Sequence, residues 1–101
     1  MSEHPLAVFE RLDPELLRLV GDGSEQTFAD GALPKRTKLL IALALDASKG
    51  AVGGVRALAQ EAMKAGATKE EIGETLRVAN YVSGVGCVYT AGEALKGLFQ
   101  P

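Results

Sequence analysis

The chain has 101 residues, of which 47% are hydrophobic and 24% charged, and its formal net charge is -2. This length and composition predict a single globular domain, residues 1–101. The net charge is near zero, and the sequence contains no block of basic residues. The longest apolar run, Leu39–Leu45, is far shorter than the roughly 20 residues of a membrane span. We therefore expect neither a nucleic-acid partner nor a membrane partner.

The chain contains one cysteine, Cys87, and one histidine, His4. A lone cysteine forms no internal disulfide, and residues 1–13 lack the apolar core of a signal peptide, so we expect a cytoplasmic protein. The acids are dispersed, and the glycines form neither a dinucleotide fingerprint nor a phosphate loop. We therefore expect no metal and no cofactor.

The first predicted helix covers residues 13–20, where Asp13 caps the helix and Pro14 fits its first turn. We expect Gly21 and Gly23 to stop it, which makes residues 21–34 the main loop. A second helix is predicted to start near residues 33–35. Its apolar run covers every helical face, so it should be central and buried. A short buried strand is the alternative, but the alanine content and the few β-branched residues favour a helix.

Two amphipathic helices are expected after Gly50. The first has Arg56 on its polar side and an apolar stripe of Val52, Val55, Leu58, Ala59, Ala62 and Met63. Gly66 then suits a helix end, and Thr68 with Glu71 forms a capping box for the next helix. That helix should turn Ile72, Leu76, Ala79 and Val82 inward. After a break at residues 83–86, a final helix should present Val88, Ala91, Leu95 and Leu98. The sequence therefore predicts an all-α domain with about five or six helices.

Three stretches carry a family resemblance: "LPKRTKLLIALAL", "AQEAMKAGATKEEIGETLRVANYVSGVG" and "AGEAL". Over roughly residues 30–98 they resemble the carboxymuconolactone decarboxylase family, which includes the alkyl hydroperoxidase D-like (AhpD-like) proteins. The resemblance implies a compact all-α domain that assembles as a homo-trimer or homo-hexamer.

The resemblance also places the family's reactive groups on this chain. The Cys-x-x-Cys of the peroxidase branch falls on Ala51 and Gly54, and the histidine of both branches falls on Leu58. The relay acid would fall near residues 38–39, where no acid stands. Disulfide exchange requires a thiolate and a resolving thiol, so a dithiol peroxidase mechanism is not possible within this chain.

Four residues remain as candidate catalytic groups. Asp46 follows the apolar run, and we expect it to be largely buried against a basic or hydroxyl partner, with Arg56 the obvious choice. Arg56 is either a solvated residue or an anchor for a substrate carboxylate. Cys87 is either inert packing or a thiol activated by a helix N-terminus. Tyr81 either packs at an interface or presents its hydroxyl to a ligand.

Three classes of function stay open. The first is a small-molecule lyase or isomerase for a carboxylate-bearing substrate, with a pocket between helices or subunits. The second is a non-catalytic oligomeric binding protein, and the third is a peroxiredoxin-type antioxidant that uses Cys87 alone. In each case the expected partners are further copies of the chain and a small-molecule ligand. A closed polar pocket would favour the first class over the second.

Overall fold

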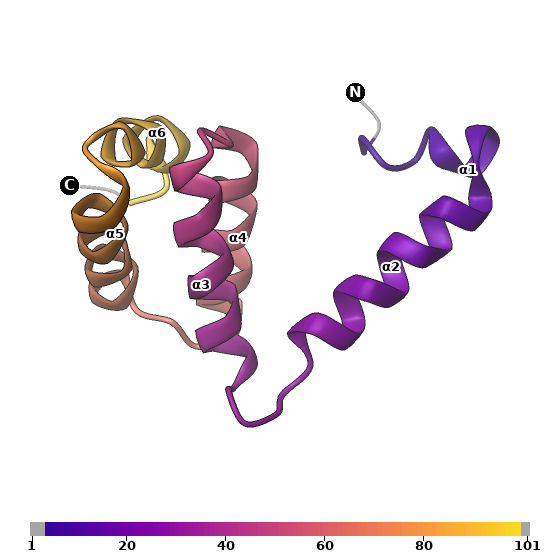
Figure 1. The fold of residues 1–101 in the computed structure, drawn as a ribbon, viewed down its shortest axis with the longest axis horizontal. Coiled ribbons are helices and arrows are strands. Elements are labelled where there is room, and N and C mark those ends of the chain that lie inside the picture. The colour runs from indigo at the N-terminus through magenta and orange to yellow at the C-terminus, as the bar shows by residue number, and fades with distance from the viewer. Residues whose placement is uncertain (1–3, 100–101) are drawn as a thin grey trace.

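The computed structural model describes residues 4–99 and is all-α, as predicted. It contains six helices, which are α1 (Phe9–Leu12), α2 (Pro14–Phe28), α3 (Lys35–Ser48), α4 (Val52–Lys64), α5 (Lys69–Ser83) and α6 (Gly86–Leu95). Helices α3 to α6 pack together, and α3 contacts the other three. We call these four helices the bundle (Figure 1). None of the six is long and apolar enough to cross a membrane.

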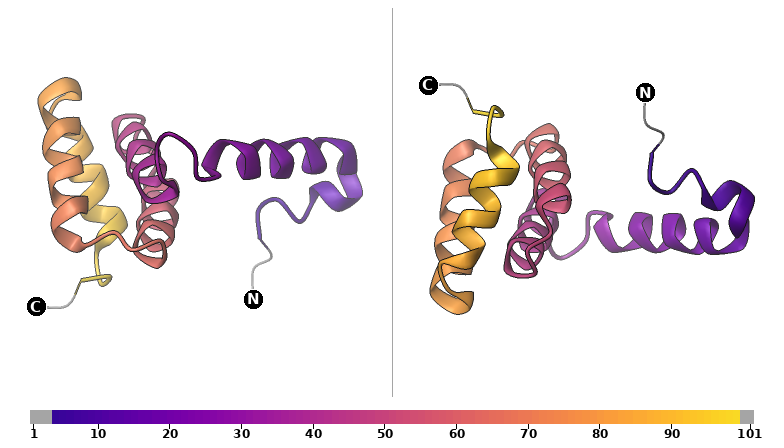
Figure 2. Two further views of the ribbon diagram at one scale, coloured as in Figure 1. Left: turned by 90° about the horizontal axis from the view of Figure 1, so that it is seen from below. Right: turned by 90° about the horizontal axis from the view of Figure 1, so that it is seen from above.

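The N-terminal part of the chain leads away from the bundle. Residues 4–28, which include α1 and α2, form an extension that we call the arm, and all three views show it projecting from the start of α3 (Figures 1 and 2). Helices α1 and α2 contain no buried residue. The arm therefore adds little to the core of its own chain.

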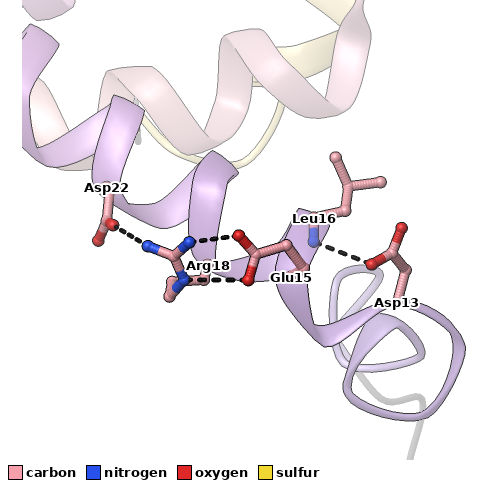
Figure 3. Close-up of polar contacts among 5 residues, drawn as sticks. All are labelled: Asp13, Glu15, Leu16, Arg18 and Asp22. Atoms are coloured by element: carbon pink, nitrogen blue, oxygen red, sulfur yellow. Dashed lines mark hydrogen bonds and ion pairs between the residues drawn. The ribbon is translucent and has the colours of Figure 1, made fainter.

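Helix α2 is longer than the sequence indicated, and the prediction that Gly21 and Gly23 end it is wrong. Its start is as expected, because Asp13 Oδ1 accepts a hydrogen bond from the Leu16 N–H at 3.1 Å. Arg18 then bonds to Glu15 and to Asp22 on successive turns of the helix (Figure 3). Each glycine lowers the stability of a helix by only about 1 kcal/mol relative to alanine, and these ion pairs offset part of that loss.

The linker between arm and bundle, residues 29–34, is hydrogen-bonded at several points. The Lys35 N–H donates to Asp30 Oδ1 at 2.7 Å, and Lys38 Nζ donates to the Ala29 carbonyl at 2.7 Å. Within the linker, the Gly31 N–H donates to the Leu33 carbonyl. These bonds fix the direction in which the arm leaves α3.

The core of the bundle is built mainly from small side chains, with Leu43, Val55 and Ile72 as its largest fully buried residues. Packed with them are Ala47, Ala59, Ala79, Cys87, Ala91 and Ala94. Alanine at these positions lets the helices approach closely, which fits the scarcity of aromatic residues.

The predicted boundaries of α4 and α5 are confirmed in outline. Gly50 and Gly66 both have positive φ, at 77° and 102°, where the chain turns into the next helix. Thr68 and Glu71 form the expected capping box at the start of α5. Helix α6 ends at Leu95, earlier than the sequence suggested, and Gly97 follows with φ 77°.

Several predictions of burial are wrong for the single chain, among them those for Val52 and Val88, which were expected on apolar stripes and are 39% and 44% exposed. Helix α3 is central, but Ile41 and Leu45 on its outer side are 47% and 57% exposed. Val82, expected to face inward from α5, is 76% exposed. The bundle covers one side of each of these helices, and nothing in residues 4–99 covers the other.

Candidate functional site

Asp46 lies in the last turn of α3 and is half-buried. Its carboxylate rests directly on Gly54, in the first turn of α4. A Cβ atom on Gly54 would overlap Asp46 Oδ2 and would lie 3.0 Å from Asp46 Cγ. The same Cβ would lie 3.6 Å from the Cβ of Ala51. Asp46 therefore occupies the place where the family resemblance puts the dithiol.

The prediction that Asp46 is largely buried against a basic or hydroxyl partner is wrong, because the side chain is half-buried and its surroundings suit a carboxylate without pairing it. Ala51, at the N-cap of α4, provides no side-chain cap, and the start of a helix carries a partial positive charge. Across residues 4–99, no hydrogen bond or ion pair reaches the Asp46 side chain. Its oxygens are thus available to a substrate or to water.

Arg56, the expected partner of Asp46, bonds instead to backbone carbonyls at the end of α6. Its Nη1 donates to the carbonyls of Ala94 and Lys96, each at 3.0 Å. These carbonyls lie at the C-terminal end of α6, where cations and hydrogen-bond donors are favourable. The structure does not bring Arg56 and Asp46 together, and Arg56 ties α4 to α6.

Cys87 and Tyr81 lie at opposite extremes of exposure. Cys87 is buried in the core, and its Sγ donates to the Gly84 carbonyl at 2.9 Å. Tyr81 is 91% exposed at the end of α5. Neither side chain lies in a cavity that would hold a substrate against it.

A hollow of about 640 Å³ forms a wedge between the arm and the bundle. Its apolar lining includes Leu58, the position to which the family histidine is carried over. The lining comprises Leu6, Val20, Gly21, Ser24, Glu25, Phe28, Ala29, Asp30, Lys35, Leu39, Leu58 and Glu61. None of the four candidate residues lines it. In the described part of the chain, no three acidic, cysteine or histidine residues group as metal ligands.

The sequence alone did not reveal this wedge. Val20, Glu25 and Phe28 face it only because α2 continues through its glycines, and that continuation was missed. The pairing of Asp46 with Gly54 was also missed. The sequence did contain an indication of this contact, because Gly54 stands in the first turn of an amphipathic helix, eight residues after Asp46.

Comparison with known proteins decides the family. The model of the carboxymuconolactone decarboxylase family matches residues 14–96, which include both α2 and the bundle. This chain belongs to the carboxymuconolactone decarboxylase family. The match begins well before residue 30, where the sequence resemblance began, so α2 lies within the family's shared region.

A solved structure supports the same assignment. A carboxymuconolactone decarboxylase family protein from Legionella pneumophila, crystallised in its apo form, is 40% identical to this chain and superposes with a TM-score of 0.84. The match covers 90% of this chain and 81% of the Legionella chain. A search of curated proteins found no significant match.

Proposed function

We propose that this carboxymuconolactone decarboxylase-like protein is a lyase or isomerase for a small lactone that bears a carboxylate. The observation that carries the proposal is the Asp46 carboxylate, which is half-buried, unpaired and seated on Gly54. Unlike Arg56, whose guanidinium bonds to two backbone carbonyls, the Asp46 carboxylate has no hydrogen-bond partner among residues 4–99. The substrate class follows from the family to which the chain belongs.

The chemistry needs a proton donor or acceptor and no oxidant. In a decarboxylation, the bond between the substrate's ring carbon and its carboxylate breaks, CO₂ leaves, and the electron pair enters the conjugated lactone. Asp46 would then relay a proton from solvent to the ring. In an isomerisation, ionised Asp46 would remove a proton from one carbon and return it to another. Positioned proton transfer of this kind contributes about 10²–10⁴-fold to a rate.

Deuterium exchange tests this role directly. In D₂O, wild-type protein should accelerate deuterium incorporation into carboxymuconolactone or its decarboxylated product, because Asp46 exchanges its proton with solvent. Asp46→Asn keeps the shape of the side chain and should lose the acceleration. Arg18→Gln, on the arm, serves as the matched control. Equal exchange in wild type and Asp46→Asn would refute the role of Asp46.

A non-catalytic binding protein is the second candidate, and the wedge favours it. The wedge has the volume of a ligand site, yet it contains none of the four candidate residues. For this function, native mass spectrometry of purified protein should show a bound small molecule. Replacement of Leu58 by Arg should remove that molecule, whereas Asp46→Asn should leave it bound.

The single-thiol antioxidant is the function that the geometry supports least. Peroxide must reach a thiolate, and the Cys87 thiol is buried and hydrogen-bonded to a carbonyl.

A further inference from the structure

A groove between α5 and α6 combines apolar walls with an arginine. The two helices lie side by side in the bundle (Figure 2). The groove has a volume of about 500 Å³, which is within the usual range for small-molecule sites. It is lined by Gly73, Leu76, Arg77, Asn80, Val85 and Val88.

Arg77 is exposed at this groove, and its guanidinium has no hydrogen bond or ion pair within residues 4–99. Other arginines of the chain are engaged. Arg18 and Arg36 form ion pairs with acids, and Arg56 bonds to carbonyls at the end of α6. Glu74 lies one turn before Arg77 on α5, but no ion pair joins the two side chains in the described part of the chain. The charge of Arg77 is therefore available to a ligand.

The spacing of residues along α5 leaves room beside this charge. Gly73, Arg77 and Asn80 lie on one side of the helix, because four and three positions separate them. A Cβ on Gly73 would meet no atom within 4 Å, so the space next to the guanidinium is open. The Asn80 side chain, one turn further on, has no hydrogen-bond partner among residues 4–99 and offers further donors.

The lining favours an anion that carries an apolar body. None of the lining residues within 4–99 is acidic, and α6, which begins beside the groove, has no acid in its first turn. An arginine stays charged and binds a carboxylate through two parallel N–H donors. Leu76, Val85 and Val88 provide apolar contact for the remainder of such a ligand.

We propose that the α5–α6 groove is a binding site for a small monocarboxylate with a compact apolar body. The carboxylate bonds to the Arg77 guanidinium and the Asn80 amide, and the body rests on the three apolar lining residues. Asp46 belongs to α3 and does not line the groove. The proposal is therefore independent of the chemistry at Asp46, and its test measures binding alone.

Benzoate and its uncharged analogue benzamide test the proposal, with ligand-observed NMR titrations of the full-length protein at constant ionic strength. Wild type should bind benzoate about 10- to 100-fold more tightly than benzamide, the preference expected for hydrogen bonds to a charged group. In Arg77→Gln this preference should disappear, whereas benzamide should bind as it does to wild type. Arg18→Gln, on the arm, serves as the matched control and should retain the preference.

Gly73→Leu blocks the groove while leaving Arg77 in place. Leucine favours a helix more than glycine does, so the variant should unfold at a temperature no lower than wild type. Its affinity for benzoate should nevertheless fall by at least about tenfold. The proposal is overturned if wild type binds benzamide as tightly as benzoate, if Arg77→Gln keeps the preference, or if Gly73→Leu binds benzoate as wild type does.

Discussion

The contact between Asp46 and Gly54 can be isolated with the two neighbouring glycines of α4. A Cβ on Gly53 would meet no atom within 4 Å, whereas a Cβ on Gly54 would meet the Asp46 carboxylate. Gly53→Ala should therefore raise the free energy of unfolding by up to about 1 kcal/mol, because alanine favours helix. Gly54→Ala should be less stable than Gly53→Ala, since it pushes the carboxylate from its place.

A double-mutant cycle in urea checks this prediction. In an Asp46→Ala background, the two glycine substitutions should have nearly equal effects. If the difference between them survives removal of the carboxylate, Gly54 is required for another reason.

Cys87 should behave as a core residue. Because its thiol is buried, it should react with a thiol reagent far more slowly in native protein than in denaturant. Thioredoxin- or lipoyl-coupled peroxide turnover should be negligible in wild type and in Cys87→Ser. Rapid native labelling, or turnover that depends on Cys87, would restore the antioxidant function.

At the scale of single residues, the sequence predicted types of group better than their partners. The capping box of Thr68 was readable because it is a local pattern at fixed spacing. The partner of Arg56 was not readable, since the Ala94 and Lys96 carbonyls come from a helix 38 and 40 residues away. Backbone carbonyls at a distant helix end leave no signature in side-chain identity.

Arg56 joins α4 to the end of α6, so its replacement should lower the stability of the fold. Arg56→Gln should lower the free energy of unfolding by about 1.5–3 kcal/mol, the range for a hydrogen bond to a charged group. Gln60→Ala, one turn along α4 and exposed, should change it by no more than about 0.5 kcal/mol. Chemical denaturation measures both. A change in KM with unchanged stability would instead show that Arg56 anchors substrate.

Among whole elements, the sequence located α4 and α5 well and α2 poorly. Helices α4 and α5 have clear apolar stripes and glycines with positive φ before them. In α2, Gly21 and Gly23 were interpreted as breaks, but both lie within the helix, and a Cβ at either position would meet no atom within 4 Å. Glycine weakens a helix without forbidding it, and the Arg18 ion pairs lie across this stretch.

For the whole molecule, the exposed apolar sides of α2, α3 and α5 predict self-association. A monomer of this length buries only about two-thirds of its unfolded surface, and these helices still expose Leu19, Leu45 and Val82. Sedimentation at low micromolar concentration should therefore give a mass of at least two chains, with a trimer or hexamer expected from the family. A mass near 10.6 kDa with cooperative unfolding would contradict this.

The fold and family were accessible from sequence, whereas the surfaces that meet in an assembly were not. Periodicity predicts which side of a helix is apolar, and this was enough for an all-α domain. It does not distinguish burial in the same chain from burial in a second copy. The run from Leu39 to Leu45 illustrates this, because Leu39 and Leu43 face the core while Ile41 and Leu45 face outward.

The central proposal is that Asp46 performs acid–base chemistry in the place where the family resemblance puts the dithiol of the peroxidase branch. The most direct measurement is the rate of CO₂ release from carboxymuconolactone by wild type, Asp46→Asn and Gly54→Ala. We predict measurable release by wild type, at least a 100-fold lower kcat for Asp46→Asn, and an intermediate loss for Gly54→Ala. Release that is unchanged in Asp46→Asn, or undetectable with wild type, would contradict the claim.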